Sequence, residues 1–344
     1  MRRSAGTASH ARHLIGSRFL CVLVACMSMA TFSLSAGAQS TRVSIEPRAK
    51  TRGSADRSTT DRGSSNIRVN SDLVLIPVTV TDNLNRFVTG LDKEHFKLYE
   101  DKVEQTITHF ASEDAPISVG LVFDCSGSMG DKLKKSREAV AQLLKTANPE
   151  DEFFLVEFND RAELVVSLTK RSEEIQNRLA FTQSKGRTAL LDAIVLSMNE
   201  MRKAHNPRKA LVIISDGGDN SSRYTVSEVK NRVREVDVQI YAIGILELFG
   251  ERRRTPEEFA GPGLLNDIGE QTGGRLFEVG NLNELPDVAS KIGEALRNQY
   301  VLGYAPSVVR RDGKYHRVRL KLVKPKGWPS LRAYWRLGYY APAR

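Results

Sequence analysis

Residues 117–130 read ISVGLVFDCSGSMG, and this stretch decides the fold. Its first half is a continuous apolar run that ends at Asp124 and gives way to serines and glycines. Such a pattern predicts a buried strand followed by a tight turn. The turn presents Asp124, Ser126 and Ser128 on alternate positions. A carboxylate and two hydroxyls are hard oxygen ligands, which suit Mg²⁺ or Mn²⁺, with Ca²⁺ as a further candidate, and argue against Zn²⁺.

The pattern Asp-x-Ser-x-Ser after a strand resembles the metal-ion-dependent adhesion site of the von Willebrand factor type A family. In that family a threonine on a second loop and an aspartate on a third loop complete the coordination. The matching residues are Thr188, in Gly-Arg-Thr-Ala at 186–189, and Asp216, in Ile-Ile-Ser-Asp-Gly at 213–217. Asp-x-Ser-x-Ser alone is also typical of ordinary turns. Three matches in the family's order favour the metal site.

The region from 115 to 298 alternates strand and helix patterns, which predicts a doubly wound, mostly parallel sheet covered on both faces. Thr188 falls near a predicted helix start, where a helix-capping role is the alternative to metal binding. In such sheets ligands bind beyond the carboxyl ends of the strands, where Asp124 and Asp216 are expected. Strands are predicted at 117–124, 152–158, 162–168, 210–215, 238–246 and 275–279, and helices at 132–147, 188–201, 225–236, 264–272 and 282–297.

The segments on either side of this region have β patterns. Short strands are predicted at 73–81, 87–88, 96–100 and 105–110, and again at 300–304, 316–323 and 331–340. We expect the two flanks, 71–114 and 299–344, to pair into one β-sandwich. The motifs at 88–91, 96–101 and 299–304 resemble a group of bacterial secreted proteins described as von Willebrand factor type A-related proteins of Acidobacteria.

The amino-terminal region has the pattern of an export signal. Residues 1–38 carry four arginines and no acid, then an apolar run, and end in the small residues Ala36-Gly37-Ala38. We predict a signal peptide cleaved after Ala38; an alternative is a lipoprotein signal acylated at Cys26. Cleavage after Ala38 leaves Cys125 as the one cysteine, so an internal disulfide is excluded, and Cys125 is interpreted as a small buried filler. The protein is expected in the periplasm, at the cell surface or secreted.

The net charge of +10 does not indicate a nucleic-acid ligand, because most of it lies outside the predicted domains. Residues 1–38 contribute +4 and residues 39–70 another +4, with seven basic and three acidic residues. The latter segment is rich in Ser, Thr, Arg and Gly, which predicts a flexible linker. From residue 71 onward the charge is only +2. No stretch after the signal has the ~20 apolar residues of a membrane span.

These observations together predict an exported, non-enzymatic module for cell adhesion. The family resemblance implies that an acidic side chain of a protein partner completes the metal site. Three arginines in the segment 247–263 are candidates for selecting that partner: Arg252, Arg253 and Arg254. The alternatives are a metal-dependent hydrolase that uses the same cluster and a structural domain of the cell envelope. The histidines at 95, 109, 205 and 316 show no spacing typical of metal ligands.

Overall fold

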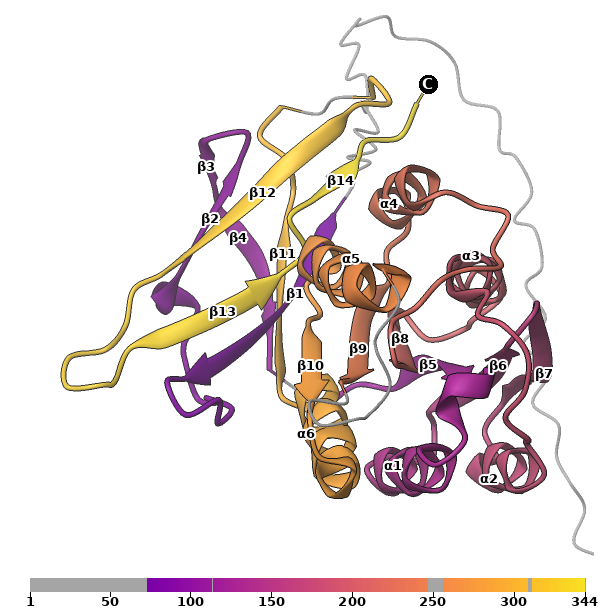
Figure 1. The fold of residues 1–344 in the computed structure, drawn as a ribbon. Helices are drawn as coiled ribbons and strands as arrows, with labels where there is room; N and C mark the ends of the chain where they lie inside the picture. Colours follow the sequence, from indigo (N-terminus) through magenta and orange to yellow (C-terminus); the bar gives the residue numbers. More distant parts are fainter. Residues whose placement is uncertain (1–72, 113, 247–255, 309–310, 344) are drawn as a thin grey trace, which may run out of the picture. The chain divides into compact units, whose positions relative to one another are not determined.

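The fold was obtained as a computed structural model, which describes residues 73–112, 114–246, 256–308 and 311–343. Figure 1 shows a central sheet covered by helices and, beside it, antiparallel strands from both ends of the described chain. The predicted signal peptide and linker, residues 1–38 and 39–70, lie outside the described residues. None of the helices in the described ranges is long and apolar enough to cross a membrane.

The central sheet has six strands in the order β10-β9-β8-β5-β6-β7. Neighbouring strands are parallel except β6 and β7, which are antiparallel at one edge. β5 (Ile117–Asp124) is buried at every residue and pairs with β8 (Arg208–Ser215). Strands buried on both faces read as continuous apolar runs, which is why the sequence predicted both. The other four are β6 (Glu152–Phe158), β7 (Ala162–Thr169), β9 (Gln239–Ile245) and β10 (Leu276–Val279).

Helices cover both faces of this sheet (Figure 1). Successive side chains of a strand point to opposite faces, so Leu121 and Phe123 of β5 join one core while Val122 joins the other. The first core includes α1 (Leu133–Lys145), α2 (Ser172–Ala180) and α6 (Leu285–Arg297), and the second α3 (Leu190–Met201), α4 (Val226–Glu235) and α5 (Pro256–Thr272). The predicted fold class, a doubly wound and mostly parallel α/β sheet, is confirmed.

The two flanks pair with each other, as predicted. One antiparallel sheet has the order β13-β1-β11-β4 and the other β14-β12-β2-β3. Both sheets mix amino-terminal and carboxy-terminal strands, and their apolar side chains share one core that includes Ile76, Leu98 and Leu302. The strands are β1 (Val74–Asp82), β2 (Phe96–Glu100), β3 (Val103–Gln105), β4 (Ile107–Ala111), β11 (Gln299–Tyr304), β12 (Tyr315–Leu322), β13 (Leu331–Trp335) and β14 (Gly338–Tyr340).

Five local predictions were incomplete. The strand expected at 105–110 is divided between β3 and β4. The helix α2 was not predicted, and the predicted strand at 331–340 is two strands, β13 and β14. Phe87 makes only an isolated bridge with Thr81 instead of a strand. The helix expected at 264–272 begins earlier, at Pro256, and contains Pro262. Glycines flank this proline, a local pattern typical of a loop, but the next turns bury Leu264, Leu265 and Ile268 in the second core. Packing outweighs local propensity there.

Gln299, the first residue of β11, joins the sandwich to the central sheet. Its side chain is buried, and its Nε2 donates to Gln239 Oε1 at 2.8 Å and to the hydroxyl of Tyr241 at 3.3 Å. An ion pair of 2.8 Å between Arg336 and Asp237 joins the same two parts at the surface. A buried amide with satisfied hydrogen bonds fixes how the strands meet, because a shift would leave polar groups unpaired.

Candidate metal centre

Three loops meet at the carboxyl edge of the central sheet, and each carries part of the predicted metal set. Asp124 ends β5 and Asp216 follows the neighbouring β8, so both carboxylates arrive at the same edge. Thr188 lies just before α3, whose first residue is Leu190. Ligand sites in open parallel sheets lie at this edge. The fold thus brings together the segments in which sequence analysis placed the site.

Asp124 is fully buried, and both of its carboxylate oxygens accept hydrogen bonds. Oδ1 accepts from the backbone N–H of Ser126 at 2.9 Å, and Oδ2 accepts from the hydroxyl of Ser215 at 2.6 Å. Burial raises the pKa of Asp124 to about 7, with a further contribution from the charge of Asp216. A cation beside Asp124 would favour the ionised form. Ser215, which orients this carboxylate, was not predicted from the sequence.

The serine loop after β5 is held by a second segment of the chain. Ser126 and Ser128 lie at the start of the short helix η2 (Gly127–Met129), and their hydroxyl oxygens are 3.0 Å apart. The hydroxyl of Ser184 donates to the carbonyl of Ser126 at 2.5 Å, and the N–H of Gly127 donates to the carbonyl of Gly186 at 3.0 Å. Two hydroxyls on alternate positions, held in this way, form a preorganised pair of oxygen ligands.

Thr188 is not the helix cap. The cap of α3 is Ala189, which has no side-chain cap hydrogen bond. The backbone of Thr188 is instead tied to the loop after Asp216: its N–H donates to Asn220 Oδ1 at 2.9 Å, and its carbonyl accepts from the N–H of Asn220 at 2.9 Å. Asn220, another residue that the sequence did not single out, therefore fixes the loop that carries Thr188 against the loop that follows Asp216. We call these the second and third metal loops, and the serine loop after β5 the first.

Asp216 provides the observation that fits a cation best. Its Oδ2 lies 3.1 Å from the ammonium nitrogen of Lys132, while its buried Oδ1 has no hydrogen-bond partner among the described residues. A buried carboxylate oxygen without a partner costs free energy unless a cation or a donor meets it. An oxygen left open beside Asp124 and two serine hydroxyls suits a hard divalent ion. The residues present therefore fit the predicted metal.

Lys132 is a functional candidate that sequence analysis missed. It is the N-cap residue of α1, its side chain is 7% exposed, and its ammonium group contacts the carboxylate of Asp216. A positive side chain at a helix amino terminus opposes the helix dipole, which is a sequence signal that a compensating anion lies nearby. When both are ionised, Asp124 and Asp216 carry two negative charges, and Lys132 brings the net charge of the three side chains to −1.

A family model for the von Willebrand factor type A domain matches residues 118–291, half of the chain. The chain belongs to the von Willebrand factor type A family. The mouse protein named inter alpha-trypsin inhibitor, heavy chain 4, is 30% identical over 145 residues, which are 38% of this chain and 15% of that protein. A protein of Borreliella burgdorferi is 25% identical over 186 residues, covering 48% of this chain and 54% of that protein. The chain thus spans only a small part of the mouse relative.

Among solved structures, a von Willebrand factor type A protein from Catenulispora acidiphila matches 80% of this chain and 75% of its own, with 14% identity and a TM-score of 0.47.

In the type A domain of this protein, α5 closes on the third metal loop. The backbones of Gly217 and Gly261 are so close that a Cβ on Gly261 would lie 1.6 Å from the carbonyl oxygen of Gly217. Gly217 also has φ +88°, which favours glycine. The position of the loop after Asp216 therefore depends on α5. The three predicted partner-binding arginines at 252–254, which precede this helix, lie outside the described residues.

Cys125 lies between two predicted ligands, and its thiol is buried and protonated. It is buried, and its thiol donates to the carbonyl of Phe158 at 3.2 Å. Burial raises the pKa of this thiol to about 12, and the charges of Glu157 and Asp124 act in the same direction. A thiolate is the reactive form of cysteine, so burial and the raised pKa disfavour a nucleophilic role for Cys125.

Proposed function

We propose that the type A domain of this protein binds a divalent cation and uses it to hold an acidic side chain of a protein partner. The cation, Mg²⁺ or Mn²⁺, would be held by the two carboxylates and three hydroxyls that converge at the carboxyl edge of the sheet. The observation that carries this proposal is the buried Oδ1 of Asp216, which has no hydrogen-bond partner among the described residues. It lies beside the carboxylate of Asp124, whose two oxygens each accept a hydrogen bond. The proposed ligands are Asp124, Ser126, Ser128, Thr188 and Asp216.

The charges around the site favour an anionic partner. The two ionised carboxylates and Lys132 together carry a net charge of −1, so a bound dication leaves the site with a net charge of +1. Hydroxyl ligands and water donate little charge to the ion, which therefore remains able to accept another oxygen. A carboxylate from the partner both completes the coordination and neutralises the excess charge. Arg252, Arg253 and Arg254 are proposed to add to this selection for acidic partners.

Calorimetry with Mg²⁺ and Mn²⁺ tests the metal site. One ion is expected to bind per chain with moderate affinity, because only two of the ligands are charged. Asp124→Asn, which keeps the shape of the buried side chain and removes its charge, is expected to abolish binding. Asp131→Asn, on an exposed neighbour in the same loop, is the matched control and is expected to bind as the wild type does. Full binding by Asp124→Asn would show that the ion lies elsewhere.

Capture of a partner tests the adhesion function separately. The purified protein should retain a partner from an envelope extract when Mg²⁺ is present and lose it when the ion is chelated. Asp124→Asn and Thr188→Ala should not retain the partner under either condition. Retention that survives chelation at full strength would contradict the adhesion function and leave the metal site as a structural element.

We also infer that the protein is exported, on the strength of the arginine-rich start, the apolar run and Ala36-Gly37-Ala38. Amino-terminal sequencing of the protein isolated from the cell is expected to find Gln39 as the first residue. An intact Met1, or a lipid on Cys26, would contradict cleavage after Ala38.

A further inference from the structure

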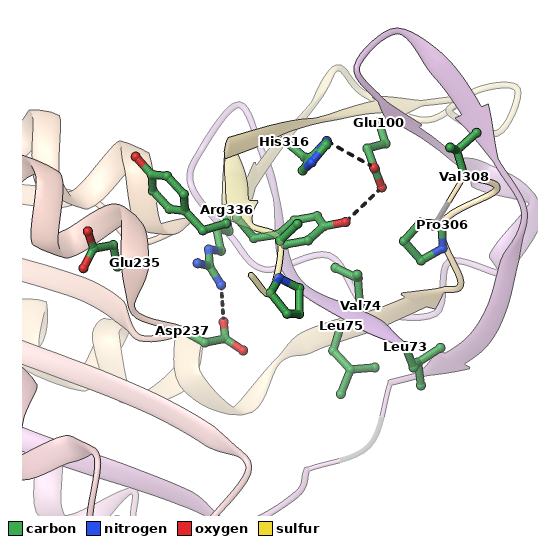
Figure 2. A pocket seen from close by; sticks show the side chains of 14 residues that line it. Leu73, Val74, Leu75, Glu100, Glu235, Asp237, Pro306, Val308, His316 and Arg336 are labelled. Atoms are coloured by element: carbon green, nitrogen blue, oxygen red, sulfur yellow. Dashed lines mark hydrogen bonds and ion pairs between the residues drawn. The ribbon is translucent and has the colours of Figure 1, made fainter. Parts of the chain in front are cut away.

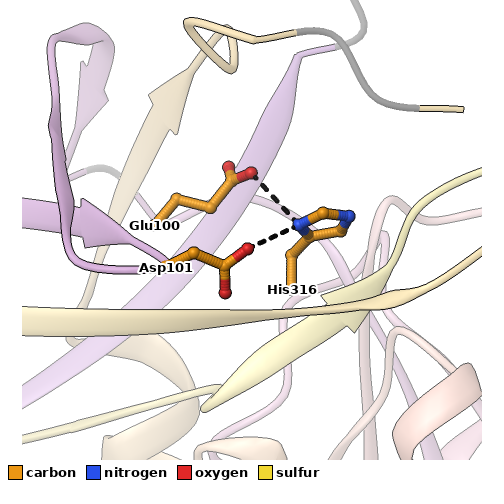
Figure 3. A group of neighbouring side chains, drawn as sticks. All are labelled: Glu100, Asp101 and His316. Atoms are coloured by element: carbon orange, nitrogen blue, oxygen red, sulfur yellow. Dashed lines mark hydrogen bonds and ion pairs between the residues drawn. The ribbon is translucent and has the colours of Figure 1, made fainter. Parts of the chain in front are cut away.

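The β-sandwich holds a second cluster of side chains of the types that bind metals, outside the part of the chain that matches the type A model. Glu100 ends β2, Asp101 begins the turn that follows, and His316 lies in the paired strand β12 (Figure 3). His316 Nδ1 is 2.8 Å from Asp101 Oδ2 and 3.6 Å from Glu100 Oε1. The three ligand atoms all lie within 4.8 Å of one another. We call these three residues the sandwich cluster.

The separation of these atoms suits a small metal ion. With bonds of about 2.0–2.2 Å and tetrahedral angles, neighbouring ligand atoms on zinc lie roughly 3.4 Å apart. The contact of 3.6 Å is already close to this value, and the contact of 2.8 Å needs to open by about half an ångström. Asp101, the ligand that has to move, is the exposed member of the cluster. One imidazole and two carboxylates are a donor set that zinc accepts.

Each member of the sandwich cluster is also held by its other polar atom. Asp101 Oδ1 accepts from the N–H of Arg317 at 3.0 Å, and Glu100 Oε2 accepts from the hydroxyl of Tyr339 at 3.2 Å. His316 Nε2 lies 3.3 Å from Asp312 Oδ1. A carboxylate on the far nitrogen of a metal-bound histidine fixes the tautomer that leaves the near nitrogen free to bind. Each of the three potential ligands is therefore oriented by a further hydrogen bond, as ligands in protein metal sites usually are.

Two further observations describe the surroundings of the sandwich cluster. Three carboxylates, those of Glu100, Asp101 and Asp312, surround a single imidazole, so the group is negative even when the ring is protonated. Tyr304 is fully buried, and its hydroxyl lies beside Glu100 and Tyr339. Burial raises the pKa of Tyr304, and the adjacent Glu100 and Tyr339 add to the effect. A buried phenol hydroxyl thus lies on the Glu100 side of the cluster.

A route from solvent reaches this cluster. A pocket of about 550 Å³ is lined by Glu100, His316 and Tyr339, with Leu75 and Pro306 on its apolar side (Figure 2). The pocket has room for water molecules, which would fill the positions on an ion that three protein ligands leave open. A site with three protein ligands and an open position can also take a ligand from solution.

We propose that Glu100, Asp101 and His316 bind a zinc ion, with Asp312 and Tyr339 as positioning residues. The alternative role of these side chains is an ion pair in which a protonated His316 joins β2 to β12. The two arrangements differ in what they require. Zinc needs a ring nitrogen without its proton, whereas the ion pair needs both ring nitrogens protonated. The experiment below separates them by direct observation of the metal.

Zinc binding should be measured in the Asp124→Asn chain, so that the type A site does not contribute. Calorimetry is expected to show one Zn²⁺ per chain, and Co²⁺ is expected to give visible absorption bands when it occupies the same site. His316→Gln and Asp101→Asn should abolish both signals. Asp312→Asn should weaken Zn²⁺ binding by about 10–100-fold, as loss of an orienting partner does. His109→Gln, on the exposed surface of β4, is the matched control and should bind Zn²⁺ normally.

Circular dichroism identifies variants that lose metal only because they unfold. Asp101→Asn is expected to stay folded, because Asp101 is exposed and the substitution leaves no cavity in the core. The absence of saturable Zn²⁺ binding in the Asp124→Asn chain, or equal binding by the folded His316→Gln and Asp101→Asn variants, would overturn the proposal in favour of the ion pair.

Discussion

Lys132 shows how a single buried charge sets the properties of the type A site. Its ammonium group balances half of the negative charge of Asp124 and Asp216, and it contacts one oxygen of Asp216 while the other oxygen stays open. The lysine therefore offsets negative charge at Asp216 when no metal is bound, and in the proposed metal-bound state it increases the positive charge of the site. One residue thus serves both states of the site.

Replacing this lysine should separate the two effects. Lys132→Met is expected to lower the free energy of unfolding of the metal-free protein by about 3–5 kcal/mol, because Asp216 is left as an unpaired buried charge. The same variant should bind Mg²⁺ more tightly, since no cation competes for Asp216 Oδ2. Urea unfolding with and without Mg²⁺, together with calorimetry, checks both expectations.

Lys135→Met provides the comparison, because Lys135 pairs with Glu138 at the surface, where an ion pair contributes little. Equal Mg²⁺ affinity in the wild type and in Lys132→Met would show that Lys132 does not influence the charge at the metal.

At the scale of elements, Glu152 anchors the edge of the sheet opposite to the metal loops. It begins β6, accepts from the hydroxyl of Ser118 in β5 at 2.6 Å, and accepts from the N–H of His205 at 2.6 Å. Burial disfavours the carboxylate, but the hydrogen bonds from Ser118 and His205 outweigh it and lower the pKa of Glu152 to about 2. One carboxylate therefore joins two strands and the loop after α3.

The pH dependence of this anchor follows from the lowered pKa. Because the pKa of Glu152 is lower in the folded state than its usual 4.5, its stabilisation is present above pH 4.5 and is lost as the pH falls towards 2. Glu152→Gln is expected to lower the free energy of unfolding by about 2–3 kcal/mol at pH 7 and by much less near pH 2.5. Urea unfolding at the two pH values measures the difference, and an equal loss at both would contradict the assignment.

The helix α5 provides a second prediction at this scale. Gly261→Ala places a methyl group against the carbonyl of Gly217, so α5 or the third metal loop must move. The expected cost is about 1–3 kcal/mol of stability together with weaker Mg²⁺ binding.

Gly263→Ala is the matched control, because a Cβ at Gly263 meets no atom within 4 Å. The control should be neutral or more stable by up to about 1 kcal/mol, since alanine favours the helix. Unchanged Mg²⁺ affinity in Gly261→Ala would show that α5 does not position the loop. Thermal unfolding and calorimetry on the two variants decide between these outcomes.

At the scale of the whole molecule, the sandwich depends on both flanks of the type A domain. β1 pairs with β11 on one side and with β13 on the other, and both partners come from the carboxy-terminal flank. Deletion of residues 299–344 is therefore expected to leave the amides of β1 unprotected in hydrogen exchange. The central sheet should keep its protection and its Mg²⁺ site. Protection of β1 in the shortened chain would show that this strand is stabilised by other contacts.

The sequence predicted most of what depends on local patterns. Buried strands such as β5 are recognised in the sequence as apolar runs. The family motif located Asp124 and Asp216 at the ends of adjacent strands. Lys132, Ser215 and Asn220 were missed because their roles arise from contacts between separate loops. The sandwich cluster was missed for the same reason: Asp101 and His316 are 215 positions apart and meet only through the pairing of β2 with β12. No spacing rule for metal ligands covers such a distance.

The pairing of β1 with β11 and β13 has a consequence for the order of events during synthesis. A ribosome completes β1 more than two hundred residues before it reaches β11, its first pairing partner. The type A domain, whose strands and helices lie between them, is complete before β11 emerges, and domains generally fold as they are completed. β1 and β4 must therefore remain without their partner strands in the meantime, and the sandwich is the last part of the described chain to be completed.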